Sequence, residues 1–290
     1  MNNIDVIDLF CGCGGFSEGA KQAGCDVPLA IDNWDDAIRV HSLNHPNTSH
    51  MNLTLGYDDV HELLENQILT SRVRNKRIHV HASPPCQNIS IANPSRDTKK
   101  GIEMVKWTVD LLQNLGVDSW SVENVYNTKL MPLVAEHGGQ LLYMEKLGLP
   151  QSRKRLFIGD VHLSIPDSPV IVGMDSVLSQ TDRLPWDEYV CKNVIKNTMY
   201  KNGIKTGIPP PPLYLTRALS DPSYTITSKR AEIINTRDYT REKLTILETA
   251  MLQSFPIDYN WGDTNITNCA KMIANAVPPL VSKLIMESLI

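Results

Sequence analysis

The sequence lacks several features that would each define a class of protein. Its six cysteines form no Cys-x-x-Cys pair and no cysteine–histidine cluster at zinc spacing, which excludes a zinc finger and makes Cys11 and Cys13 only a minor candidate for a metal site. It has no internal repeat, and its longest low-complexity tract is the four prolines at 209–212. It contains no apolar run of membrane-spanning length. We therefore expect neither a metal nor a membrane partner.

Positive charge is not in excess, because 28 lysines and arginines face 32 acidic residues, for a net charge of −4. A protein that binds nucleic acid usually has a basic footprint. The charge is unevenly distributed, however: residues 191–245 contain ten basic and four acidic residues, a net of +6 that leaves −10 for the rest. One basic segment on an acidic body is compatible with phosphate contacts on one face, and a solvated surface is the alternative.

The first residues lack the positive charge and the unbroken apolar run of a secretory signal, since Asp5 and Asp8 interrupt them. The composition, 42% hydrophobic and 21% charged, is that of an ordinary globular chain. We therefore expect an intracellular protein, cytoplasmic or nucleoid-associated, with its thiols reduced. A chain of 290 residues is long enough for one large α/β domain and a small appendage.

The N-terminal half alternates short apolar, β-rich runs with helical stretches, the pattern of a parallel sheet with crossover helices. The predicted strands are 4–10, 27–31, 78–82 and 119–122, and the predicted helices are 16–23, 35–44, 58–69 and 99–115. Two further apolar runs, 139–145 and 155–161, are too close together for a crossover helix. They predict an antiparallel pair at the edge of the sheet.

A different region begins near residue 164, where periodicity fades and proline becomes frequent. We predict a catalytic, cofactor-binding domain made of 1–163 and 240–290, and a small loop-rich domain over 164–239. A helix is predicted over 241–254 with Thr240 as its N-cap. A terminal helix is expected after the double proline near the C-terminus.

A glycine-rich turn, DLFCGCGGF, links the first predicted strand to the first helix. Gly12, Gly14 and Gly15 would let a ligand approach the backbone, and the helix N-terminus offers free amides. Asp32 lies where the second strand ends, a place at which a carboxylate typically binds ribose hydroxyls. The pattern favours a nucleoside cofactor over a purely structural turn. Trp34 could stack on an adenine ring or be a partly buried surface residue.

The stretch ASPPCQNIS puts a cysteine after the predicted strand 78–82, at the edge where open α/β sheets bind ligands. Pro84 and Pro85 fix the backbone and push Ser83 toward an extended conformation, so Cys86 should be aimed outward. A rigidly displayed thiol suits a nucleophile. The alternative, a buried structural cysteine, fits poorly with the polar residues that follow.

Two further motifs reach the same sheet edge. Glu123 ends the strand of WSVENVY and is either a polar loop residue or a proton donor to a substrate. In QSRKRLF, Arg153 and Arg155 alternate, so in an extended segment they would point the same way. Two guanidiniums on one face suit a phosphate or a carbonyl oxygen.

Taken in order, these motifs resemble those of the DNA cytosine-5 methyltransferase family. DLFCGCGGF, SPPCQ, ENV and QSRKR resemble four family motifs, and REKLTILETAMLQSFP and ANAVPPLV resemble the last two. The resemblance covers most of the chain except about 164–215. It implies a Rossmann-like α/β methyltransferase fold with a mostly parallel sheet, a target-recognition domain at 164–239, S-adenosylmethionine as cofactor and double-stranded DNA as partner.

The resemblance also implies a role for each motif. Cys86 would add to carbon 6 of a flipped-out cytosine, while Glu123 protonates or hydrogen-bonds ring nitrogen 3. Arg155 would hold the base carbonyl and the nucleophile loop, and Arg153 would lie nearer phosphate. Carbon 5 would then take the methyl group, and loss of its proton would release Cys86.

For the cofactor, the resemblance implies adenine stacking by Phe10 and closure by Asn275, with Asn52 in place of the family's acidic residue near the adenine amino group. Ala274 replaces the glycine of the last motif. The short recognition region implies few base-specific contacts. The expected cofactor-binding residues are Phe10, Gly12, Gly14, Gly15, Asp32, Trp34, Asn52, Pro84 and Asn275.

Three alternatives stay open at this point. The same chemistry on tRNA is the nearest, because a branch of the family acts there. A nucleic-acid-binding protein with an inactive site and a nicotinamide dehydrogenase are the others, the last suggested by the glycine-rich turn alone. The biological role is open between restriction-modification, viral self-protection and a solitary enzyme, as are the recognition sequence and the oligomeric state.

Overall fold

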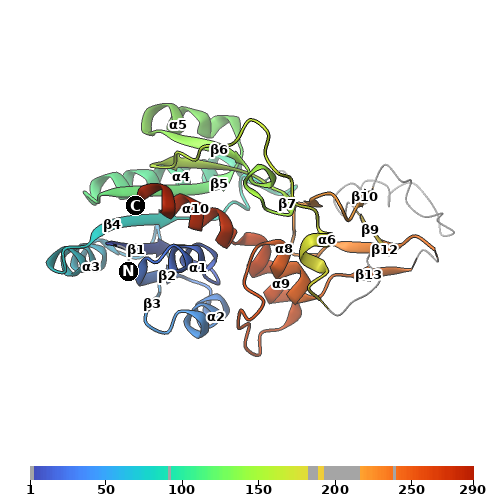
Figure 1. Cartoon of the computed structure of the whole chain (residues 1–290). Coiled ribbons are helices and arrows are strands. Elements are labelled where there is room, and N and C mark those ends of the chain that lie inside the picture. The colour runs from blue at the N-terminus through green and yellow to red at the C-terminus, as the bar shows by residue number, and fades with distance from the viewer. Residues whose placement is uncertain (1–2, 91–92, 182–188, 193–215, 238–239) are drawn as a thin grey trace.

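The structure is a computed structural model that describes residues 3–90, 93–181, 189–192, 216–237 and 240–290. Its body is a seven-stranded sheet with strand order β3-β2-β1-β4-β5-β8-β6 (Figure 1). Strands β1 to β5 run parallel. Strand β8 runs antiparallel to both β5 and β6. The predicted α/β fold with a mostly parallel sheet, and its antiparallel pair at the edge, are therefore confirmed.

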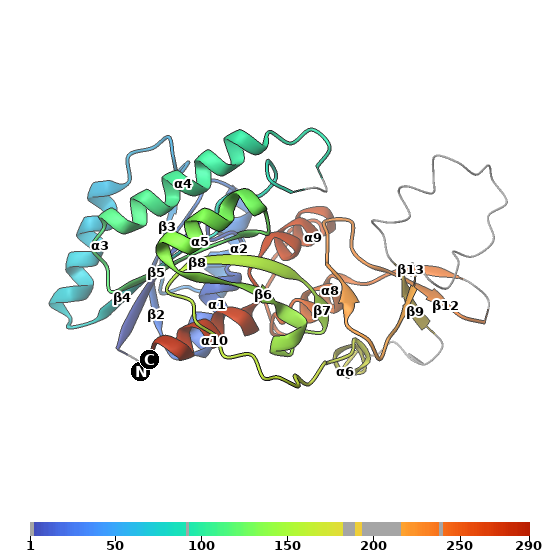
Figure 2. The same ribbon diagram turned by 90° about the horizontal axis from the view of Figure 1, so that it is seen from above.

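Helices cover both faces of this sheet (Figure 2). Helices α1 and α10 share one hydrophobic cluster, and α3, α4 and α5 share another on the opposite face. The strands are β1 (Ile4–Leu9), β2 (Asp26–Asp32), β3 (Ser49–Asn52), β4 (Arg77–Ala82), β5 (Ser119–Val125), β6 (Gly139–Tyr143) and β8 (Lys154–Gly159). The helices are α1 (Gly15–Gln22), α2 (Asp35–Asn44), α3 (His61–Val73), α4 (Thr98–Asn114), α5 (Met131–His137) and α10 (Pro279–Leu289).

The four predicted strands and four predicted helices of the N-terminal half are all present, with ends displaced by a few residues. Strand β3 was not predicted. Its sequence, SHMN, has no apolar alternation because β3 is an edge strand whose side chains are exposed or half-buried. No helix among the described residues is long and apolar enough to cross a membrane.

The helix predicted over 241–254 is wrong in its first turn. Residues Arg241–Lys243 form β13, and α8 (Ile246–Leu252) starts afterwards. Thr245, rather than Thr240, caps the helix: its hydroxyl accepts from the Glu248 amide at 3.1 Å, and the Glu248 carboxylate accepts from the Thr245 amide at 2.6 Å. This reciprocal capping box fixes the start of the helix after Thr245. The charged residues Arg241–Lys243 therefore lie outside the helix and can form a strand.

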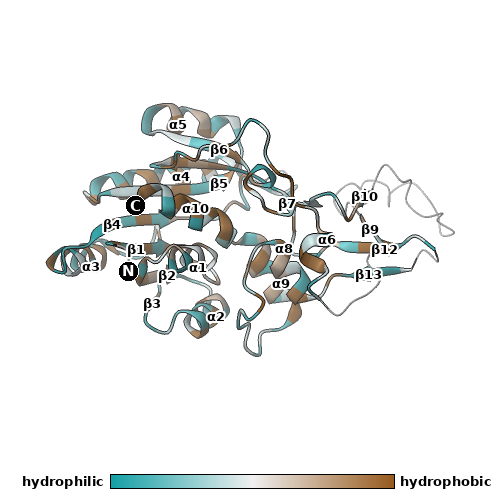
Figure 3. Cartoon of the chain, in the orientation of Figure 1, coloured by the Kyte–Doolittle hydropathy of each residue, from teal (hydrophilic) through white to brown (hydrophobic). Residues whose placement is uncertain are grey.

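A four-stranded sheet, β10-β9-β12-β13, lies beside the body (Figure 1). Its strand β13 is hydrophilic along its whole length (Figure 3). Buried residues of this sheet, such as Ile233 and Cys191, share a hydrophobic cluster with α8 and α9. The division into a catalytic and a recognition domain stays a prediction.

The remaining elements are β7 (Gln151–Ser152), β9 (Tyr189–Lys192), β10 (Thr216–Ala218), β11 (Ser223–Tyr224), β12 (Glu232–Asn235), α6 (Asp175–Leu178), α9 (Ile266–Asn275), η1 (Thr128–Leu130) and η2 (Met144–Leu147).

Candidate active site

A cavity of about 410 Å³ opens at the carboxyl edge of the seven-stranded sheet. Its walls come from the C-terminal ends of β1, β2 and β5, from the segments that follow β1, β2 and β4, and from the C-terminal end of α9. Its lining includes Phe10, Asp32, Cys86, Glu123 and Asn275. Parallel strands end at one edge of a sheet, so residues more than 200 positions apart meet there.

The loop after β4 is anchored at both ends and displays a thiol between them. The carbonyl of Cys86 accepts the amides of Ile89 and Ser90 at 2.9 and 2.8 Å. The Asn124 side chain donates to the Pro84 carbonyl at 3.0 Å, which ties the loop to β5. Cys86 is half-buried and lines the cavity, which is consistent with a thiol accessible to a ligand.

Glu123 and Arg155 form a largely buried ion pair next to this thiol, with Arg155 Nε 2.9 Å from Glu123 Oε1. Burial raises the pKa of Glu123, and the guanidinium of Arg155 opposes that rise. Burial also raises the pKa of the Cys86 thiol; Arg155 again opposes the rise, while Glu123 adds to it. A thiol near a cation is suited to nucleophilic addition to a nitrogen heterocycle. A neighbouring carboxyl that can hold a proton is suited to protonating that ring.

Arg153 contacts backbone carbonyls, whereas its resemblance to the family implied a place near a phosphate. It is 1% exposed, and its Nη2 donates to the carbonyls of Ala274 and Ala276 at 3.0 and 3.1 Å. The strand is interrupted at this residue, because β7 pairs with β11 and β8 begins one residue later. Burial lowers the pKa of Arg153 to about 9. Its guanidinium holds the backbone on both sides of Asn275 instead.

Asp32 ends β2 and is held by backbone amides. Its carboxylate accepts from the Gly12 amide and from the Trp34 amide, both at 2.9 Å. Burial raises the pKa of Asp32, and these amide hydrogen bonds oppose that rise. Each carboxylate oxygen keeps further acceptor capacity, so Asp32 fits a ligand that offers hydroxyl donors to the cavity.

The three predicted glycines have different roles. Gly12 lines the cavity. A Cβ on Gly14 would lie 2.9 Å from the Tyr259 hydroxyl oxygen and 3.0 Å from two histidine rings, and one on Gly15 would lie 2.2 Å from the Val277 carbonyl oxygen. Gly14 and Gly15 therefore permit close packing at the start of α1, and their assignment to the cofactor stays a prediction.

Phe10 lies between two cavities. The second, of about 210 Å³, is lined by Phe10 together with Leu53, Leu55 and Met104, among others. An apolar slot beside the pocket that contains Asp32 suits the flat ring of a nucleoside base. Leu53, Leu55 and Met104 were not predicted, although the apolar LTL after β3 was a signal for the two leucines.

Two other cofactor predictions have different outcomes. Asn52 is exposed at the end of β3, and its amide donates to Asp35, away from both cavities. Trp34 lines the main cavity, and the ammonium of Lys271 lies 4.3 Å from the centre of its ring. Lys271 and Met272 of α9 also line the cavity. Sequence reasoning missed them because nothing in the sequence shows that α9 lies against the end of β2.

The alternative metal site gains no support from the environment of its thiols. Cys11 and Cys13 are both buried in the glycine-rich turn. Burial raises the pKa of both thiols. A cysteine binds a metal as the thiolate, which these surroundings disfavour. Within the described part of the chain, no three His, Cys, Asp or Glu side chains are arranged to hold a metal ion.

The basic segment is only partly described, since its lysines between 193 and 215 lie outside the described residues. Arg217 serves the fold: it donates to the Ser152 hydroxyl at 2.7 Å and its guanidinium lies 4.2 Å from the centre of the Tyr224 ring. Arg230 donates to the Leu244 carbonyl at 2.9 Å. The predicted phosphate contacts of this segment stay a prediction.

Comparison with known proteins gives one consistent family. The model of the C-5 cytosine-specific DNA methylase family matches residues 4–131 and 176–290. The type II methyltransferase M.HgiDI of Herpetosiphon aurantiacus is 30% identical, with 95% of this chain and 90% of the relative covered. The type II methyltransferase M.HindV of Haemophilus influenzae is 26% identical, with 99% and 96% covered.

Solved structures share the fold. A putative DNA modification methyltransferase encoded within an E. coli prophage has a TM-score of 0.66 at 22% identity, with 99% of this chain and 98% of that chain covered. A mutant of Spodoptera frugiperda DNMT2 has a TM-score of 0.64 at 16% identity, with 98% of both chains covered. Because the family model spans most of the sequence and its motif residues converge on one cavity, this chain belongs to the C-5 cytosine-specific DNA methylases.

Proposed function

We propose that this chain takes a methyl group from S-adenosylmethionine and attaches it to carbon 5 of a cytosine extruded from double-stranded DNA. One observation carries the proposal beyond family membership. Cys86 and Glu123, the groups for cytosine chemistry, line the same cavity as Asp32 and Phe10, the groups for a nucleoside cofactor. The binding sites for the methyl donor and for the base that accepts the methyl group are therefore parts of one cavity, as direct methyl transfer requires.

The residues present fit the cofactor. Asp32 offers carboxylate lone pairs to ribose hydroxyls, and Phe10 borders an apolar slot for the adenine ring. Asn275 and Pro84 complete the wall on the side of the nucleophile loop, and Arg153 keeps the Asn275 backbone in place. When bound, S-adenosylmethionine supplies an electrophilic methyl group.

The protein's own residues activate the base. The Cys86 thiolate forms a bond to carbon 6, and the displaced ring electron pair is stabilised at nitrogen 3 by the proton that Glu123 donates. Arg155 orients the Glu123 carboxyl through their 2.9 Å ion pair. Carbon 5, now nucleophilic, accepts the methyl group. Loss of the proton on carbon 5 then reforms the ring double bond, breaks the carbon–sulfur bond and frees Cys86.

The target base must leave the duplex, because stacked neighbours cover both faces of a paired cytosine. Extrusion costs a few kcal/mol, which phosphate contacts would offset. We propose that residues 164–239 form the target-recognition domain that makes these contacts. The half-buried position of Cys86 is consistent with this, since a single extruded base can approach it where a duplex cannot.

The relatives named type II methyltransferases, and the neighbour described as a DNA modification methyltransferase, favour a modification role. We propose that this chain acts in restriction-modification, inside the cell where the DNA to be modified lies. The family match favours DNA over tRNA as the substrate.

Purified protein incubated with S-adenosylmethionine labelled in its methyl group tests the function. We expect label in 5-methylcytosine of duplex DNA of mixed sequence, and sequencing of the modified cytosines would give the recognition site. Label in tRNA and none in DNA would overturn the DNA assignment in favour of the RNA alternative. No label in either, with folded protein and bound cofactor, would contradict the proposal.

A further inference from the structure

Asp8 lies at the centre of the proposed site, yet the mechanism above does not use it. It is on β1, between β2, which ends in Asp32, and β4, which leads to Cys86. Asp8 is 1% exposed and lines the main cavity. The transferable methyl group must sit between the ribose-binding carboxylate and the nucleophile. The middle strand therefore brings a carboxyl group close to the place that the sulfonium must take.

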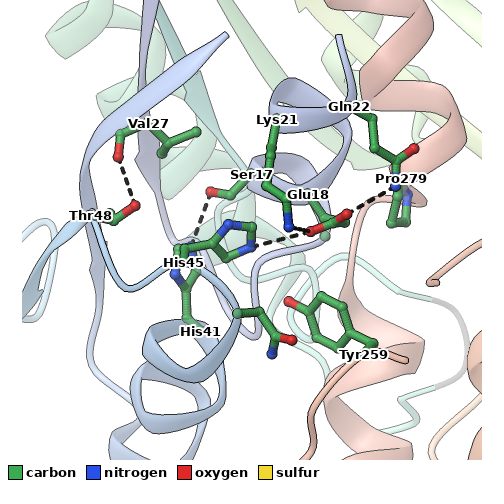
Figure 4. A network of polar contacts seen from close by, with 12 residues as sticks. Ser17, Glu18, Lys21, Gln22, Val27, His41, His45, Thr48, Tyr259 and Pro279 are labelled. Atoms are coloured by element: carbon green, nitrogen blue, oxygen red, sulfur yellow. Dashed lines mark hydrogen bonds and ion pairs between the residues drawn. The ribbon is translucent and has the colours of Figure 1, made fainter. Parts of the chain in front are cut away.

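A chain of hydrogen bonds runs from this carboxyl toward the surface. The Ser17 hydroxyl donates to Asp8 Oδ2 at 2.6 Å, and His41 Nε2 is 3.0 Å from the Ser17 oxygen. His41 Nδ1 is 2.8 Å from Nε2 of His50, which is half-buried. Figure 4 shows the contact between Ser17 of α1 and His41 of α2, with the His45–Glu18 pair beside it.

The direction of these bonds follows from the first. Because Ser17 gives its only proton to Asp8, the Ser17 oxygen must accept from His41 Nε2–H. His41 Nδ1 is then unprotonated and accepts from His50 Nε2–H. Burial lowers the pKa of His41, which is consistent with the neutral ring that this arrangement needs. Every link donates toward Asp8, as suits an ionised carboxylate.

In the described part of the chain, the side-chain partner of Asp8 is a neutral donor, the Ser17 hydroxyl. Burial raises the pKa of Asp8 to about 7; hydrogen bonds from Ser17 oppose the rise, and the charge of Asp32 adds to it. None of the ion pairs among the described residues joins Asp8 to a lysine or arginine. The titratable groups that face it are Asp32 of β2, Cys11 and Cys13 of the turn, His81 of β4, His41 of α2, Tyr259 before α9, and Cys86, Glu123 and Lys271 of the cavity wall.

We propose that Asp8 is the residue that makes this pocket prefer the positively charged methyl donor over its neutral product, S-adenosylhomocysteine. The ionised carboxylate attracts the sulfonium and loses that attraction once the methyl group has left, which favours exchange of product for donor. Ser17 and His41 are positioning residues that keep Asp8 ionised. The inference rests on the proposed function, since it presupposes that the cavity binds this cofactor.

The test is calorimetric measurement of the affinities for S-adenosylmethionine and S-adenosylhomocysteine, from about pH 6 to about pH 8. In the wild type, the ratio of the two affinities should rise with pH as Asp8 loses its proton and then level off. In Asp8→Asn the ratio should fall about tenfold at the high-pH end and lose its dependence on pH. His41→Gln should shift the rise to higher pH, because a weaker hydrogen-bond chain stabilises the carboxylate less.

Asp5→Asn is the matched control. Asp5 is buried on the same strand, but it pairs with Arg74 at 2.7 Å, at the opposite edge of the sheet. Its removal should leave the affinity ratio and its pH dependence unchanged.

An Asp8→Asn protein that binds both ligands with the wild-type ratio at every pH overturns the inference and leaves the proposed function intact. If that variant does not fold, His41→Gln decides, since a rise of the ratio at the same pH as in the wild type would overturn the inference. A wild type that binds neither ligand contradicts the proposed function as well, so the two failures are distinguishable.

Discussion

The two edges of the seven-stranded sheet use buried carboxylates differently. At the amino edge, Asp5 of β1 is 2.7 Å from Arg74 and 3.8 Å from Lys76. At the carboxyl edge, Asp8 of the same strand accepts from the Ser17 hydroxyl, and Asp32 accepts from two backbone amides. Both aspartates accept from a serine hydroxyl, Ser71 for Asp5 and Ser17 for Asp8, but among the described residues only Asp5 also pairs with cations.

The difference indicates which edge serves stability and which serves a ligand. A buried carboxylate paired with a cation is neutralised, and breaking the pair leaves an uncompensated charge. A carboxylate held by neutral donors keeps its charge toward the cavity, where a ligand can use it. Variants at the amino edge should therefore change the free energy of unfolding, and variants at the carboxyl edge should change binding or chemistry.

The largest effect is expected for Cys86→Ser, which removes the nucleophile at the carboxyl edge. Methyl transfer should fall by about 10⁴-fold or more, because a serine hydroxyl stays protonated and attacks carbon 6 poorly. Single-turnover transfer of labelled methyl groups to DNA measures the loss. An unchanged denaturation midpoint should accompany it, and a Cys86→Ser protein with residual activity within tenfold of wild type would refute the assigned role.

Glu123→Gln should reduce methyl transfer by roughly 10²-fold, the usual contribution of a general acid. Burial raises the pKa of Glu123, so the protonated form that donates to nitrogen 3 persists to higher pH than for an exposed glutamate. The wild-type rate should decline as pH rises through that raised pKa. The glutamine variant should lack this decline, and a pH profile identical to wild type would argue against proton donation.

Asp5→Asn should lower the free energy of unfolding by about 1–2 kcal/mol, because Lys76 and the half-exposed Arg74 lose a charged hydrogen-bond partner. Urea denaturation measures this change. Affinity for S-adenosylmethionine should stay within twofold of wild type. A large loss of affinity in a folded Asp5→Asn protein would remove the distinction between the two edges.

Asp32→Asn should weaken S-adenosylmethionine binding by about tenfold, because an amide accepts hydrogen bonds from ribose hydroxyls less strongly than a carboxylate. The expected loss of stability is under about 1 kcal/mol, since asparagine still accepts one of the two amide hydrogen bonds. Parallel calorimetry and denaturation would separate these effects. Loss of stability with unchanged affinity would place Asp32 with the structural carboxylates.

Residues at the carboxyl ends of the parallel strands could be predicted from the sequence. Asp32, Cys86 and Glu123 each follow or end an apolar strand, and such strands finish at one edge whatever their order. Asn52 lines neither cavity although Leu53 beside it does, because the Asn52 amide is engaged with Asp35 instead. At Arg153 the chain passes between two sheets, so the alternation of an uninterrupted strand does not apply.

The surroundings of Asp8 were beyond sequence reasoning for another reason. Ser17 and His41 belong to different helices, and their contact depends on how closely α1 packs against α2. That distance is set by Gly14, where any Cβ would meet histidine rings, and no local pattern reveals it. The sequence shows that residue 14 is a glycine. It does not show that a side chain there would contact His41, which is 27 positions away.

The central claim is a covalent bond between the sulfur of Cys86 and the target base. Duplex DNA of mixed sequence containing 5-fluorocytosine tests it, because fluorine on carbon 5 cannot leave as a proton does, so the carbon–sulfur bond should persist. With S-adenosylmethionine present, we expect a complex that survives denaturation and whose modified peptide contains Cys86. An intact, cofactor-bound protein that forms no such complex, or forms it through another cysteine, would contradict the account.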